Sequence, residues 1–284
     1  MDQPKIALVT DSASDLTKEQ RAQYNIHMVS LRVLYRDGEY RDRIEIEPEQ
    51  VYNRLSQEVP TTSLPLPGDV SALYDQLVAE GYTKVLHVCI SSGLSGTCSM
   101  VRMVAAEYPQ LNVEVIDSRT LSNGEGSLVL ACGKVLKAGG SVEDALALVK
   151  KMRESQLGVF VIRTLEYLRK GGRIGLVDSV LGTMLNLKPI IFVNDDGIYQ
   201  TLAKARGFTA ALDQMLQEVR HRYEQRPIHL TVVHGQSAEE AQKLLERARQ
   251  ALNVAEGIIA QASPVLGVHT GPTLLGMVVN EATL

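Results

Sequence analysis

The stretch KVLHVCISSGLSGT, residues 84–97, places a strand-like apolar run directly before a turn rich in serine and glycine. The apolar run ends at Ile90, and a helix-like pattern begins near Ser95. Such a turn directs backbone N–H groups and the positive end of a helix at one point, where an anion can bind. Neither this turn nor the hydroxyl-bearing segment 61–63 (TTS) contains Lys, Arg, Asp or Glu. Because a phosphate site normally includes a cation, the sequence predicts a site for a single carboxylate or a polar neutral group.

Strand and helix patterns alternate through the first half of the chain. Repeated β-α units of this kind predict a mostly parallel sheet that is covered on both faces. The expected strands are Lys5–Thr10, Ile26–Tyr35, Lys84–Ile90 and Asn112–Ile116. The expected helices are Pro48–Glu58, Gly68–Glu80, Ser95–Glu107 and Gly124–Ala138, followed by one capped by Ser141.

The second half has a different pattern, which includes a β-hairpin with its turn at residues 195–197. The expected strands are Leu157–Ile162, Lys188–Val193, Ile198–Ala205, Ile228–His234 and Ala255–Ala262. The expected helices are Thr164–Lys170, Phe208–Tyr223 and Ala238–Ala251. We therefore expect a two-lobed α/β protein, with an N-terminal lobe over residues 1–155 and a C-terminal mixed-sheet lobe over residues 156–284.

Composition excludes several classes of function. The 284 residues carry a net charge of −4, which argues against a nucleic-acid-binding protein. No apolar run is long enough to cross a membrane, and the first residues do not resemble a secretory signal. Three widely spaced cysteines predict reduced thiols in a cytoplasmic protein, and no histidine pair has metal-ligand spacing.

Polar residues follow several strands, at the edge of the sheet where ligands bind in parallel α/β proteins. They are Asp11, Ser12, Ser92, Ser95, Asp117 and Ser118. For Asp11 and Asp117 we favour the alternative that they cap helices or support loops. His269 lies in a donor-rich turn after an apolar stretch, and either a structural role or a ligand contact fits it. Arg173 follows the basic end of a helix, where the helix dipole alone attracts cations, although an exposed basic cluster could equally meet an acidic partner or anionic lipid headgroups. Arg206 has the same two interpretations.

One enzymatic interpretation rests on the chain order Ser95, Asp117, His269, which matches that of α/β-hydrolase triads. The local pattern GLSGT at residues 93–97 differs from the G-x-S-x-G elbow of those enzymes, because its second glycine comes one place early. A serine esterase or acyltransferase using Ser95 and His269 therefore remains the less favoured alternative.

Seven short motifs, in order along nearly the whole chain, resemble the DegV family, which includes bacterial fatty-acid-binding proteins that serve a fatty acid kinase. The motifs are TDS at 10–12, TS at 62–63 before Pro65, SSGLSGT at 91–97, VIDS at 115–118, GGRI at 171–174, LKPI at 187–190 and HTG at 269–271. This chain has Leu64 where many members have a glutamine before the proline.

The resemblance implies one DegV-type unit, over about residues 4–282, that encloses a long-chain fatty acid such as palmitate between its lobes. Thr62 and Ser95 would bind the carboxylate, and His269 would lie in the same polar network. Ser63, Ser92, Gly96, Asp11 and Ser12 would be neighbours of the ligand. Arg173 and Arg206 would form a surface toward the kinase or, transiently, a membrane. The protein would then be a carrier with no catalysis of its own and no cofactor besides the bound lipid.

Overall fold

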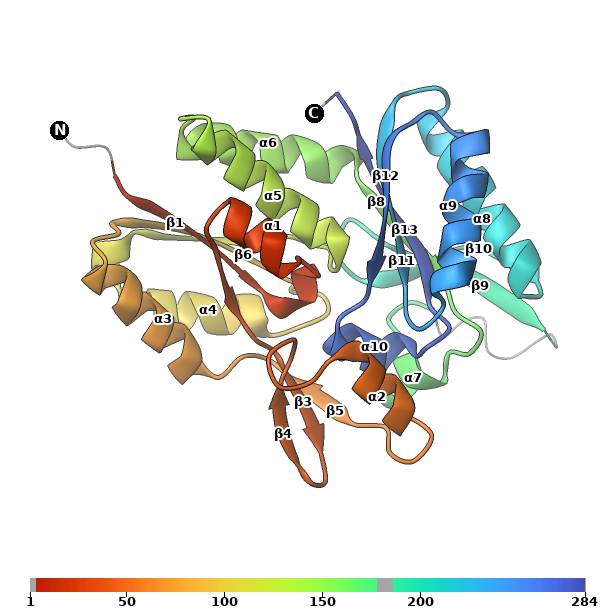
Figure 1. Ribbon diagram of the computed structural model, residues 1–284, viewed down its shortest axis with the longest axis horizontal. Helices are drawn as coiled ribbons and strands as arrows, with labels where there is room; N and C mark the ends of the chain where they lie inside the picture. The colour runs from red at the N-terminus through yellow and green to blue at the C-terminus, as the bar shows by residue number, and fades with distance from the viewer. Residues whose placement is uncertain (1–3, 178–185, 284) are drawn as a thin grey trace.

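The computed structural model describes residues 4–177 and 186–283. The strands of these residues form three sheets. Figure 1 shows the sheet of the first part of the chain and the sheet of the last part side by side, each with helices packed on it. The expected α/β fold, with a parallel N-terminal sheet and a mixed C-terminal sheet, is confirmed.

The N-terminal sheet has the order β2-β1-β6-β7, and every pair of neighbours is parallel. Its strands are β1 (Ile6–Asp11), β2 (Ile26–Val29), β6 (Lys84–Cys89) and β7 (Val113–Asp117). Side chains alternate between its faces, so that Ala7 and Val85 pack on one side while Leu8 and Leu86 pack on the other. The first face is covered by α3 (Pro67–Ala79) and α4 (Thr97–Ala105). The second is covered by α5 (Asn123–Lys137) and α6 (Val142–Ser155), with α1 (Lys18–Gln23) beside them in Figure 1.

The C-terminal sheet has the order β10-β9-β8-β13-β11-β12 and is antiparallel except between β11 and β12. Its strands are β8 (Leu157–Val161), β9 (Leu187–Val193), β10 (Tyr199–Arg206), β11 (Ile228–His234), β12 (Val254–Gln261) and β13 (Leu275–Glu281). Helices α8 (Phe208–Tyr223) and α9 (Ala238–Ala251) cover its outer face. Its inner face contributes Phe160, Ile191 and Val278 to a core shared with residues from the first part of the chain.

A third, antiparallel sheet positions the hydroxyl-bearing segment 61–63. It consists of β4 (Gly38–Arg41), β3 (Arg32–Tyr35) and β5 (Thr61–Ser63), in that order. Helices α2 (Pro48–Arg54) and α10 (Pro264–Thr270) pack against one another beside it, and α10 also contacts β5. A helix from the last part of the chain thus lies against the strand that carries Thr62.

Four local expectations were wrong. The predicted strand 26–35 is split into β2 and β3, which belong to different sheets, and the N–H of Leu31 between them donates to the Ser12 hydroxyl. Segment 61–63 is a strand, not a loop, and His269 lies in the last turn of α10 instead of an open turn. Strand β13 was not predicted. The remaining short elements are α7 (Glu166–Lys170) and two 3₁₀ turns, Ser12–Ser14 and Pro109–Leu111.

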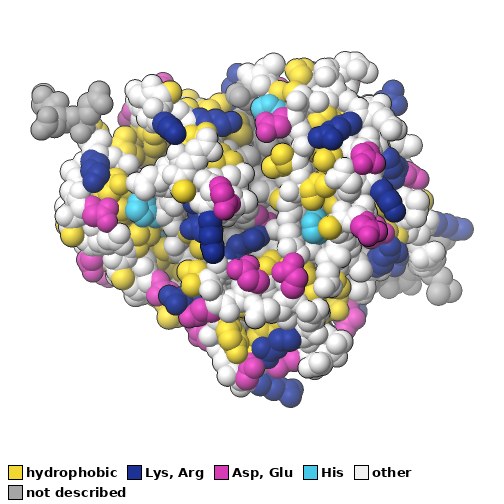
Figure 2. Space-filling view, viewed as in Figure 1, with side chains coloured by type: hydrophobic (Ala, Val, Ile, Leu, Met, Phe, Trp, Pro, Cys, Tyr) yellow, Lys and Arg dark blue, Asp and Glu magenta, His cyan; other side chains and the backbone are white. Residues whose placement is uncertain are grey.

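Acidic and basic side chains are interspersed over the face shown in Figure 2. Such mixing leaves no large field of one sign there, so recognition of a charged ligand on that face depends on local groups. Among the helices of residues 4–177 and 186–283, none is both long and apolar enough to cross a membrane.

Candidate functional site

Segments from both halves of the chain meet around one polar pocket of about 180 Å³. The turn after β6 supplies Ser95 and Gly96, and β5 supplies Thr62 and Ser63. Helix α10 supplies His269. The structure therefore brings together the three residues expected to hold a carboxylate.

Thr62 and His269 are directly connected. The Thr62 hydroxyl lies 2.8 Å from Nε2 of His269. Burial, together with the nearby charge of Arg173, lowers the pKa of His269 from 6.5 to about 4. The imidazole is therefore neutral at pH 7 and forms a polar wall of the pocket without adding a charge.

Ser95 is oriented by its own turn. Its hydroxyl lies 2.8 Å from that of Thr97 and also accepts a hydrogen bond from the Thr97 N–H at 3.3 Å. Across the described ranges, no hydrogen bond joins Ser95 to His269, and Asp117 accepts from Ser92 and Arg119 instead. The chain order of a hydrolase triad is present, but its hydrogen-bonded relay is not assembled.

Arg173 also lines this pocket, so the expectation of a site without cations was wrong. Its Nη1 donates to the carbonyl of Gly171 at 2.8 Å and its Nε donates to the carbonyl of Leu94 at 3.4 Å. The guanidinium is thus held by backbone carbonyls, with its charge uncompensated by a carboxylate among the described residues. The motif at residues 171–174 already drew attention to Arg173 as a candidate. That Arg173 lies beside Ser95, however, depends on how the two halves of the chain pack together.

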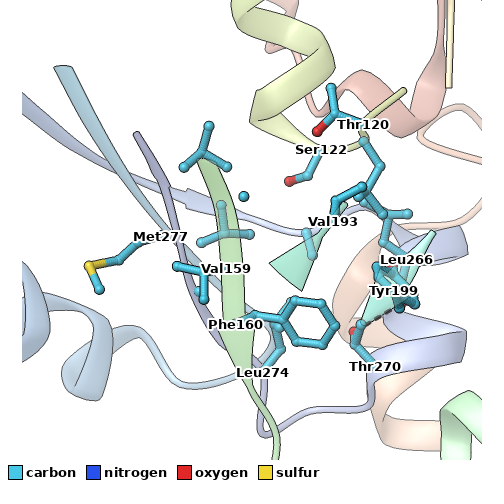
Figure 3. Close-up of a pocket in the computed structure, with 16 residues that line it drawn as sticks. Thr120, Ser122, Val159, Phe160, Val193, Tyr199, Leu266, Thr270, Leu274 and Met277 are labelled. Atoms are coloured by element: carbon cyan, nitrogen blue, oxygen red, sulfur yellow. Dashed lines mark hydrogen bonds between the residues drawn. The ribbon is translucent and has the colours of Figure 1, made fainter. Parts of the chain in front are cut away.

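An apolar cavity of about 50 Å³ adjoins the polar pocket. Leu121, Tyr199 and Leu266 line both spaces. Figure 3 shows Phe160, Tyr199 and Leu266 grouped around the cavity, whereas the side chain of Met277 points away from it. Phe160 and Tyr199 are stacked edge to face, with centroids 5.1 Å apart.

The remaining candidates have separate positions. Asp11 is fully buried and accepts hydrogen bonds from the N–H groups of Ala13 and Ile90. Ser12 accepts from Leu31, and Ser92 donates to Asp117. These three brace loops and are not among the residues that line the pocket. The interpretation of Asp11 as a capping residue is confirmed. Arg206 is exposed at the end of β10, away from the pocket lining.

Together, the fold and the pocket define an α/β protein in which a pocket with hydroxyl and imidazole groups adjoins an apolar cavity beside a mixed sheet. A family model for DegV, described as uncharacterised proteins of that family, matches residues 5–282. The chain belongs to the DegV family.

Known relatives resemble the chain along its whole length. A DegV domain-containing protein of Clostridium acetobutylicum is 40% identical over 97% of this chain and 98% of its own. The structure of a DegV family protein from Thermus thermophilus, described by its fatty acid binding, superposes with a TM-score of 0.92 at 33% identity, covering 98% of this chain and 99% of that one. A stearic-acid-binding protein from Eubacterium ventriosum superposes with a TM-score of 0.89 at 27% identity, covering 99% of this chain and all of that one.

Proposed function

We propose that this protein binds one long-chain fatty acid, with the carboxylate in the polar pocket and the alkyl chain in the apolar cavity. The observation that carries the proposal is that the pocket of Thr62, Ser95 and His269 shares the wall residues Leu121, Tyr199 and Leu266 with an apolar cavity. The fatty acids described for the related structures support the choice of ligand.

The carboxylate would be held by the hydroxyls of Thr62 and Ser95 and attracted by Arg173. If the neutral His269 carries its proton on Nε2, it donates to Thr62, and the Thr62 proton is then free to reach the ligand. A charge-assisted hydrogen bond contributes about 1.5–3 kcal/mol, which compensates for removing the carboxylate from water.

The alkyl chain would supply most of the affinity. Burying a chain of about 16 carbons gains on the order of 10 kcal/mol before the costs of binding. The cavity of about 50 Å³ is smaller than the roughly 150 Å³ that accommodates benzene in an engineered protein cavity. Loading of an alkyl chain into this cavity would therefore require its walls to separate.

We further propose that the protein presents the bound fatty acid to a fatty acid kinase, which phosphorylates the carboxylate to an acyl phosphate. A pocket lined by hydroxyls and a neutral histidine positions the carboxylate without a covalent step. Arg173 lies at this pocket and Arg206 is exposed on the surface, so an acidic partner or the reacting phosphates would approach positively charged side chains there.

The test uses delipidated protein, palmitate and hexadecanol, which differ only in the head group. Wild-type protein should prefer palmitate, and the double variant Thr62→Ala, Ser95→Ala should lose this preference while still taking up lipid. With a fatty acid kinase and ATP, the variant should lose acyl phosphate formation more than lipid binding.

The matched control is Thr61→Ala with Ser99→Ala, which removes two exposed hydroxyls, one beside Thr62 in β5 and one in α4 just after the turn of Ser95. It should behave as wild type. Failure of the wild-type protein to bind palmitate, or equal phosphoryl transfer by the double variant, would refute the assignment. Labelling of Ser95 by a serine-directed phosphonate would favour the esterase instead.

A further inference from the structure

A second cleft adjoins the apolar cavity and shares no lining residue with the carboxylate pocket. Its volume is about 560 Å³, and its walls come from α6, the segment after β7 and the turn between β9 and β10. It shares Thr120, Gly158 and Val193 with the apolar cavity and no residue with the pocket of Thr62 and Ser95. It is therefore a separate site with its own chemistry.

Three cationic side chains line this cleft, namely Arg119, Lys150 and Arg153. Burial and the positive charge of Arg119 both lower the pKa of Arg153, so the two guanidinium groups lie close enough to repel one another. Arg119 donates to the carbonyl of Asp195 at 3.3 Å. In the part of the chain that the structure describes, neither Lys150 nor Arg153 forms a hydrogen bond or an ion pair.

The neutral amides of the cleft are already engaged. Gln156 donates to Gly124, Ser127 and Asn280. Asn194 accepts from two N–H groups of its own turn and donates to Gln200. These bonds hold the walls in place and leave Lys150 and Arg153 as the cationic donors of the cleft without a hydrogen bond among the described residues.

Two carboxylates, Glu154 and Asp195, also line the cleft. Neither is within ion-pair distance of the three cations. Asp117 accepts hydrogen bonds from Ser92 and from the N–H of Arg119, and its charge attracts Arg153 without forming an ion pair with it. Adjacent guanidinium groups without a bridging carboxylate are expected where an external anion completes the charge balance.

We propose that this cleft binds a phosphate group through Arg119, Lys150 and Arg153. Guanidinium groups match the oxygens of a phosphate in a bidentate manner, and a cleft of this volume is the size of ordinary small-ligand sites. The phosphate belongs either to a free phosphomonoester or to a lipid headgroup. A ligand there would press on Thr120, Gly158 and Val193, which are also walls of the apolar cavity.

The test titrates delipidated protein with glycerol 3-phosphate by isothermal titration calorimetry and, separately, with phosphatidylcholine vesicles with and without phosphatidic acid. The variant is Lys150→Gln with Arg153→Gln. The control is Lys151→Gln with Arg102→Gln, which removes the same net charge from exposed positions that do not line the cleft.

Wild-type protein should bind at least one of the two probes, and the cleft variant should bind it at least about tenfold more weakly. The single variant Arg153→Lys should retain more of the binding than Arg153→Gln, and unchanged urea midpoints would show that the variants fold. Binding of glycerol 3-phosphate identifies a free phosphomonoester, whereas binding only to phosphatidic acid vesicles identifies a headgroup. The proposal would be overturned if wild-type protein bound neither glycerol 3-phosphate nor phosphatidic acid vesicles. It would also be overturned if the cleft variant and the control variant lost binding equally. Because the titration needs no fatty acid, its outcome is independent of the proposed lipid binding.

Discussion

Gly171 lies directly against the imidazole of His269: a Cβ atom built on Gly171 would be 2.0 Å from Nδ1 of the ring. That nitrogen is buried and has no hydrogen-bond partner among the described residues. The absence of a side chain at residue 171 is thus what lets the ring reach Thr62 on the other side. The glycine that ends α7 also shapes the polar pocket.

The variant Gly171→Ala should therefore displace His269 and break its contact with Thr62. We expect affinity for palmitate to fall about tenfold, the equivalent of one lost hydrogen bond to a charged group, as measured by displacement of a fluorescent fatty acid. Gly68→Ala is the control, because a Cβ there meets no atom within 4 Å. Unchanged affinity in Gly171→Ala would show that the ring position does not matter for binding.

The titration of His269 should respond to Arg173. Because the pKa of His269 is about 4 in the folded protein, below its ordinary 6.5, the unfolded chain binds the proton more readily. The contribution of this group to stability is complete above pH 6.5 and is lost as the pH falls toward 4.

In Arg173→Gln, loss of the neighbouring positive charge should raise the pKa of His269, which NMR of the imidazole protons measures directly. Arg206→Gln is the control, since Arg206 is not among the groups that shift this pKa. A pKa that stays at its wild-type value in Arg173→Gln would mean that burial alone accounts for the shift.

Filling the apolar cavity should shorten the chain that the protein accepts. A Cβ on Gly158, which lines the cavity, would lie 3.8 Å from Thr120 and Val193, in ordinary contact. We therefore expect Gly158→Val to fold and to narrow the cavity. If its methyl groups displace about two methylene groups of the ligand, palmitate affinity should fall roughly tenfold. Octanoate serves as the internal control, because a shorter chain leaves that region empty. Equal losses for both acids would place the alkyl chain elsewhere.

Asp11 should matter for stability more than for ligand binding. Burial raises the pKa of its carboxyl to about 7, and both of its oxygens accept backbone hydrogen bonds, from Ala13 and Ile90. Asp11→Asn places an NH₂ group against one of those N–H donors and should lower the free energy of unfolding by about 1–3 kcal/mol in urea denaturation.

The control is Asp196→Asn, at an exposed turn position. Palmitate affinity of the folded Asp11→Asn protein should remain near the wild-type value. If Asp11→Asn lost much of its palmitate affinity without losing stability, Asp11 would instead be a ligand-binding residue.

Much of the fold could be predicted because its signals are local. Strand β6 and helix α4 follow from the apolar run and the helical spacing around residues 84–107, and Ser141 forms the expected capping box with Asp144. Strand β13 was missed because its neighbours β8 and β11 bury it between them, so its run of apolar residues lacks the alternation of a half-exposed strand. Helix α10 is short and almost entirely buried, which removes its amphipathic pattern.

The amino-acid sequence by itself determined the alternation of strands and helices, the polar turn before α4 and the hydroxyl groups offered to a ligand. Only the tertiary structure decided that His269 reaches Thr62, 207 residues away, that Arg173 joins the same pocket and that an apolar cavity adjoins it. The physical reason is that hydrophobic periodicity reports which face of an element is buried, whereas the meeting of loops depends on how whole sheets pack together.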